Sequence, residues 1–72
     1  MGKTIDAIYG VPDESPVVQL FIAGTGPQWG ELRASSGTLQ LQIFTPTHGG
    51  TWTVDANELV QVIDLARQRL QQ

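Results

Sequence analysis

The stretch that decides the fold is residues 54–72, which read VDANELVQVIDLARQRLQQ. Asp55 and Glu58 have the spacing of a capping box, in which Asp55 accepts from the Glu58 N–H and Glu58 reaches back to the N–H of Asp55. Val54 before the cap and Leu59 after it have the spacing of a hydrophobic staple. The sequence therefore predicts a helix that begins directly after Asp55.

An apolar stripe follows this cap at the period of an α-helix. The stripe consists of Leu59, Val62, Ile63, Ala66 and Leu70. Arg67 and Arg69 fall in the last turns, where positive charge suits the helix dipole. The pattern predicts an amphipathic helix with one face packed on another layer of the protein.

The chain before this helix has the pattern of β-strands separated by short turns. Alternating apolar residues and β-branched content predict strands over residues 3–9, 17–23, 28–34, 38–45 and 51–54. Glycine, proline and serine predict the turns between them, at residues 10–16, 24–27, 35–37 and 46–50. Because such short connections join antiparallel neighbours, a meander is the simplest sheet.

The predicted fold is α+β, with one domain over residues 1–72. An antiparallel meander of four or five strands would carry the C-terminal helix on one face, in the order β-β-β-β-β-α. Val54 must face the helix to contact Leu59, and Trp52, two residues earlier, shares its side. The residues expected to meet the helix are Leu20, Ile22, Leu39, Leu41, Ile43, Trp52 and Val54.

A single helix covers only one face of such a sheet, so the outer face is predicted to be free for a partner. This face should be nearly uncharged, with aromatic rings among amides and hydroxyls, like the core of a protein interface. Tyr9 is a further aromatic that could lie there. The predicted partner-binding residues are Val17, Gln19, Phe21, Trp29, Gln40, Gln42 and Phe44.

Size and composition narrow the function classes. The chain has 72 residues, no cysteine, one histidine and a formal charge of −3. A cysteine-free chain of this size favours the cytoplasm over secretion, and self-association is a common support for so small a core. No apolar run approaches the roughly 20 residues of a membrane span, and no signal peptide is expected at the N-terminus. The few cations argue against nucleic-acid binding.

Candidate catalytic residues are sparse. His48 lies in a predicted turn without a ligand-spaced partner, and no serine has the context of a nucleophile. The glycines at residues 24–30 match neither a dinucleotide fingerprint nor a P-loop, and they are expected to form a loop that presents Trp29. Asp13 and Glu14 are adjacent in a turn, where they would not converge on a substrate. We therefore expect no catalytic, cofactor-binding or metal-binding site.

The sequence favours a small non-enzymatic module that binds another protein or itself, as a homodimer formed through its sheet. Small acidic regulators, inhibitors and phage accessory proteins are of this general kind. The alternative is single-stranded nucleic-acid binding by sheet aromatics, which the acidic charge disfavours. A further alternative is an enzyme with a small pocket near residues 24–30 and His48.

Overall fold

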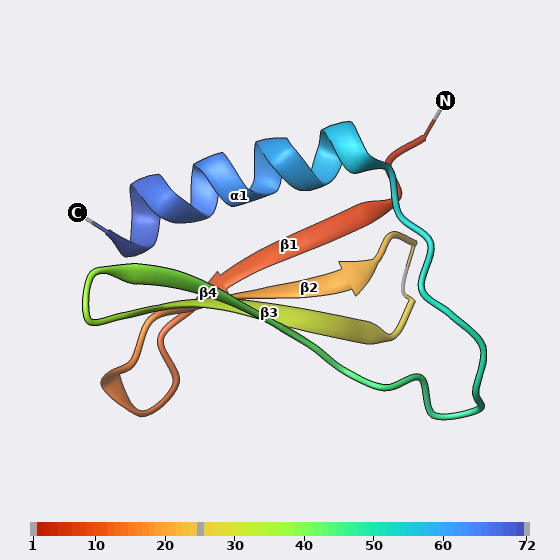
Figure 1. Cartoon of the computed structure of the whole chain (residues 1–72), viewed down its shortest axis with the longest axis horizontal. Helices are drawn as coiled ribbons and strands as arrows, with labels where there is room; N and C mark the ends of the chain where they lie inside the picture. Colours follow the sequence, from red (N-terminus) through yellow and green to blue (C-terminus); the bar gives the residue numbers. More distant parts are fainter. Residues whose placement is uncertain (1, 25, 72) are drawn as a thin grey trace.

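The computed structural model describes residues 2–24 and 26–71, so Thr25 in the predicted turn at residues 24–27 lies outside the described residues. Within these described residues, four strands precede the C-terminal helix, as expected (Figure 1). The elements are β1 (Ile5–Gly10), the 3₁₀ turn η1 (Pro12–Glu14), β2 (Val17–Ile22), β3 (Gln28–Ser35), β4 (Thr38–Ile43) and α1 (Ala56–Leu70).

The strands form one antiparallel meander in the order β1-β2-β3-β4, which confirms the predicted topology. The β3–β4 hairpin closes through Ser36 and Gly37, whose φ angles are 52° and 79°. Two positive φ angles in a two-residue loop are the geometry of a type I′ turn, which matches the twist of paired strands. This turn sets the register in which Ser35 lies opposite Thr38.

The predicted helix begins as expected. Asp55 is the N-cap, and its Oδ2 accepts from the Glu58 N–H at 2.9 Å. Glu58, however, does not return to the N–H of Asp55. Its carboxylate accepts from the N–H of Thr4 at 2.8 and 3.0 Å and from the Thr4 hydroxyl at 3.0 Å, while the Asp55 N–H donates to Thr4 Oγ1 at 2.8 Å. The cap therefore also ties the start of α1 to the segment before β1.

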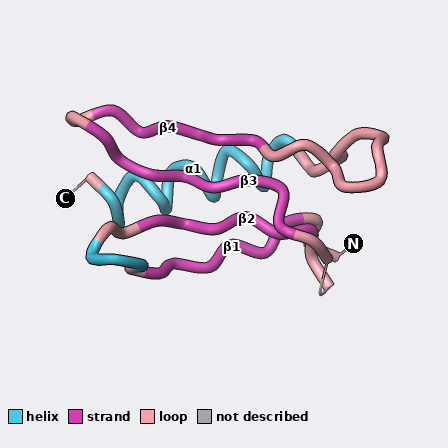
Figure 2. The backbone as a smooth tube through the Cα atoms, turned by 90° about the horizontal axis from the view of Figure 1, so that it is seen from below, coloured by secondary structure: helices cyan, strands magenta, loops and turns pink. Residues whose placement is uncertain are grey.

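The core lies between α1 and one face of the sheet. Figure 2 shows the sheet from its other face, with α1 behind it. Its fully buried members are Ile5, Val18, Leu20, Trp29, Leu32 and Ala66. Partly buried residues surround them, as the helical stripe and the strand alternation predicted: Ile22, Leu39, Trp52, Val54, Leu59, Val62, Ile63 and Leu70. The side chains of α1 that pack on this core all belong to the predicted stripe.

Two expectations about the core are corrected. The segment over residues 51–54 is not a strand. Side chains hold it instead, because the Trp52 indole N–H donates to the Phe44 carbonyl at 2.6 Å and the next residue, Asp55, bonds to Thr4. Leu41 and Ile43 do face the helix side, but they remain 37% and 60% exposed because α1 packs mainly across β3 and β1.

Candidate interaction surface

The register assigns the residues of the outer sheet face to rows across the strands. Ile8, Gln19, Glu31 and Gln42 form one row, and Gly10, Val17, Arg33 and Gln40 form the next. Phe21 lies between Asp6 and Gln28 in a third row. Phe44 follows the alternation of β4 one residue beyond its end, and its N–H donates to the Trp29 carbonyl at 2.9 Å. We call this set of residues the outer face.

Five of the predicted partner-binding residues lie on this face within the paired strands, four of them with accessible side chains, and Phe44 continues the alternation of β4 one residue past its end. Gln40 and Gln42 are exposed, whereas Gln19, Phe21 and Phe44 are half-buried. Val17 has the outward parity, yet only 1% of its surface is exposed, at the start of β2 opposite Arg33. A partner that docks on the outer face would therefore meet the amides and the two phenylalanines rather than Val17.

Trp29 is the main departure from the predicted site. The β2–β3 register shifts between Leu20 and Phe21, so that Leu20 faces Gly30 while Phe21 faces Gln28. Trp29 is the extra residue of this bulge, and bulges re-aim side chains. It is 3% exposed and belongs to the core cluster, so neither the outer face nor a loop presents it. A one-residue bulge leaves no mark in a simple alternation, and sequence reasoning therefore missed it.

Two further features of the outer face differ from the expectation. Ile8 is 51% exposed and stands opposite Gln19. Its alternation with Ala7 and Tyr9 was the signal that could have placed it on this face. Glu31 and Arg33 also lie here, and they form an ion pair with each other. The outer face is therefore not free of charge: it carries the Glu31–Arg33 pair and also Asp6, whose carboxylate pairs with Lys3 at 3.5 Å.

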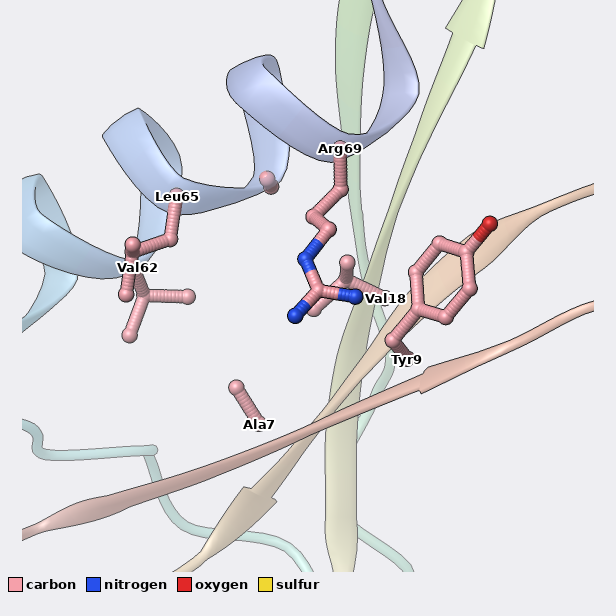
Figure 3. A pocket seen from close by; sticks show the side chains of 7 residues that line it. Ala7, Tyr9, Val18, Val62, Leu65 and Arg69 are labelled. Atoms are coloured by element: carbon pink, nitrogen blue, oxygen red, sulfur yellow. The ribbon is translucent and has the colours of Figure 1, made fainter.

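Tyr9 lies on the opposite side of the sheet, beside α1. The guanidinium carbon of Arg69 is 5.4 Å from the centroid of the Tyr9 ring, which is the geometry of a cation–π contact (Figure 3). The two side chains border an apolar groove of about 160 Å³ between β1 and α1, lined also by Ala7, Val18, Val62 and Leu65. The groove lies beside β1, which is at the opposite edge of the sheet from β4.

The positive charges of the chain are engaged locally. Lys3 pairs with Asp6 at 3.5 Å, Arg33 with Glu31, and Arg67 with Asp64 at 3.4 Å, while Arg69 lies over Tyr9. These are all of the lysines and arginines in the sequence. Each of these four cations therefore has an acidic or aromatic side chain as its neighbour.

His48, the histidine considered for catalysis, lies in the loop between β4 and α1. His48 is exposed beside a shallow hollow formed with Pro27, Pro46 and Trp52. Across residues 2–24 and 26–71, no group of three or more His, Asp or Glu side chains is placed to hold a metal ion.

Within the same residues, no helix has the length and hydropathy needed to cross a membrane.

Comparison of the chain with protein-family models, with curated proteins and with solved structures finds no match.

Proposed function

We propose that this protein is a small non-enzymatic protein–protein interaction module that self-associates as a homodimer and presents its outer face to a partner. The observation that supports the proposal is the outer face itself. In the described part of the chain, α1 covers only the other side of the sheet, and Phe21, Phe44 and Ile8 stay accessible among glutamines.

The chemistry of the outer face suits a protein partner. Rings and one aliphatic side chain provide apolar area, and the glutamines at positions 19, 28, 40 and 42 offer both hydrogen-bond donors and acceptors. Glu31 and Arg33 compensate each other, so covering them would not bury a lone charge. A standard interface takes about 800 Å² from each partner. That is a modest part of the 5100 Å² surface of this chain.

We set this module in the cytoplasm, since a chain without cysteine lacks the disulfides on which small secreted domains usually depend. Regulation or inhibition of a larger protein is the role that a compact module with one binding face would serve. The proposal includes no cofactor and no metal.

The test is a pull-down from cell lysate with wild-type protein and two outer-face variants. In the first, Phe21 and Phe44 are both replaced by serine. In the second, the exposed Gln42 is replaced by lysine, which adds a charge to the face and should leave the fold intact. Leu65→Ser is the matched control, because Leu65 is 61% exposed on α1, away from the outer face.

We expect each outer-face variant to lose at least tenfold in the recovery of any protein that wild type and Leu65→Ser both capture. Circular dichroism confirms that the variants are folded. Equal recovery by wild type and Gln42→Lys, together with equal recovery by a folded Phe21→Ser, Phe44→Ser variant, would show that the outer face is not the binding surface.

A further inference from the structure

In the part of the chain that the structure describes, the free edge of β4 carries unpaired main-chain groups. There β4 is the last strand of the sheet and pairs only with β3. The Phe44 N–H donates to the Trp29 carbonyl, which shows that the even-numbered residues of this segment direct their main chain toward β3. By the alternation of an antiparallel ladder, Leu39, Leu41 and Ile43 direct their N–H and C=O groups to the free edge.

The two edges of the sheet differ in their protection. At β1, the Ile5 N–H donates to the Glu58 carboxylate at 3.3 Å, Lys3 and Asp6 place charges beside the strand, and Arg69 lies over Tyr9. β4 reads Thr-Leu-Gln-Leu-Gln-Ile and contains neither a charge nor a proline, and its register with β3 is unbroken. Charges, prolines and bulges are the devices that keep edge strands from pairing with other chains. β4 has none of these.

Apolar side chains beside this edge are also left uncovered. Leu41 is 37% and Ile43 is 60% exposed on the helix side of the sheet. Leu65 lines the groove on the β1 flank of α1, and helical geometry places Val60 on the opposite flank, toward β4. Val60 is 58% exposed. The edge and its surroundings thus form one surface with main-chain donors and acceptors and an apolar border.

We propose that β4 pairs with β4 of a second copy of this chain, antiparallel across a two-fold axis at Leu41. In this register, Leu41 faces its own copy and Leu39 faces Ile43, so that all free-edge residues exchange hydrogen bonds. Gln40 faces Gln42 on the outer face. A second copy is the occupant that fits, because the strand is self-complementary and brings no like charges together.

The resulting dimer has one continuous sheet with both helices on the same side. The exposed apolar residues that border the gap between the two helices are then Leu41, Ile43 and Val60. The two-fold axis places these residues of one copy near the same residues of the other. The interface is isologous and closes at two copies, because the protected β1 edges stay at the ends. This edge pairing rests on the proposed function, because it specifies the surface through which the module self-associates. The outer faces of both copies stay open to a partner.

A single cysteine tests the register directly, because the chain has no cysteine of its own. Hydrogen-bonded antiparallel residues have Cα atoms about 5.5 Å apart, within disulfide range. Leu41→Cys should therefore form a cross-linked dimer under mild oxidation at low micromolar concentration. Ala7→Cys, at an exposed residue of the protected edge strand β1, and Phe21→Cys, on the outer face, are the matched controls and should cross-link at least tenfold less.

Light scattering across a dilution series provides the second measurement. We expect a dimer for wild type and a monomer for Leu41→Pro, since proline removes an edge N–H without removing a bond to β3. If Leu41→Pro does not fold, Leu41→Lys serves instead, because it sets two like charges opposite each other.

Two results would overturn the edge pairing: a wild-type monomer at every concentration, or a dimer in which Phe21→Cys cross-links and Leu41→Cys does not. The outer face is judged separately. If the protein is a β4-linked dimer, but its Gln42→Lys variant and its folded Phe21→Ser, Phe44→Ser variant still capture the same proteins, only the proposed use of the outer face would be refuted.

Discussion

At the scale of single residues, Glu58 joins the helix to the sheet. Its carboxylate accepts hydrogen bonds from the N–H groups of Thr4 and Ile5 and from the Thr4 hydroxyl. In a local capping box the same carboxylate would serve only its own helix. Here the carboxylate bonds to the main chain at the start of β1, as a neighbouring strand would. These bonds fix the position of α1 along β1.

Replacement of Glu58 by alanine should lower the free energy of unfolding by about 1.5–3 kcal/mol, because several part-buried donors lose a charged acceptor. Asp64→Ala is the control. Asp64 is exposed on the same helix and makes an ion pair with Arg67 at 3.4 Å, so its loss should change stability by no more than about 0.5 kcal/mol. Urea unfolding of both variants gives the comparison, and equal effects would show that the Glu58 contacts do not anchor β1.

At the scale of elements, the close approach of β3 and β4 depends on a glycine. A Cβ at Gly30 would lie 2.9 Å from the main-chain oxygen of Gln42, and this oxygen cannot move without shifting β4. Gly30 follows the bulge at Trp29 and faces the helix side beside Leu20. The bulge and the glycine together allow the large indole to enter the core while the two strands stay paired.

Gly30→Ala should therefore destabilise the fold by about 1–3 kcal/mol through overpacking. Gly10→Ala is the matched control at another strand position, because a Cβ there meets nothing within 4 Å. We expect Gly10→Ala to leave the thermal midpoint unchanged or slightly raised, since alanine restricts the unfolded chain. Thermal unfolding followed by circular dichroism distinguishes the two, and a Gly30→Ala midpoint at or above that of wild type would contradict the argument.

Local rules account for the elements that the sequence predicted well. The Asp55 cap, the helical stripe and the meander all follow from near-neighbour chemistry, and the structure confirms them. Residues 51–54 and Trp29 were predicted wrongly for a different reason. Their positions depend on bonds between distant segments, such as Trp52 with Phe44, and on a bulge that shifts one strand against its neighbour. For the candidate surface, parity placed Phe21, Gln40 and Gln42 correctly, but exposure had to come from the packed structure.

At the scale of the whole molecule, the distribution of charge distinguishes between a protein and a nucleic acid as the partner. The chain carries a formal charge of −3, and every lysine and arginine is engaged by a nearby acid or ring. Phosphate binding would have to break these local contacts and overcome the net repulsion of a polyanion. The accessible rings of the outer face are flanked by glutamines and by the Glu31–Arg33 pair, which cannot attract a strand of phosphates.

We therefore expect no binding of a fluorescently labelled single-stranded oligonucleotide, with unchanged anisotropy up to about 100 μM protein at low salt, where electrostatic attraction is strongest. Anisotropy of the label is the better readout, because Trp29 is buried and the Trp52 indole is bonded to Phe44, so neither tryptophan reports on the outer face. A variant with Gln40 and Gln42 both changed to lysine serves as the positive comparison, since it adds cations beside Phe44. Salt-sensitive binding by wild type itself would refute the assignment of a protein partner to this face.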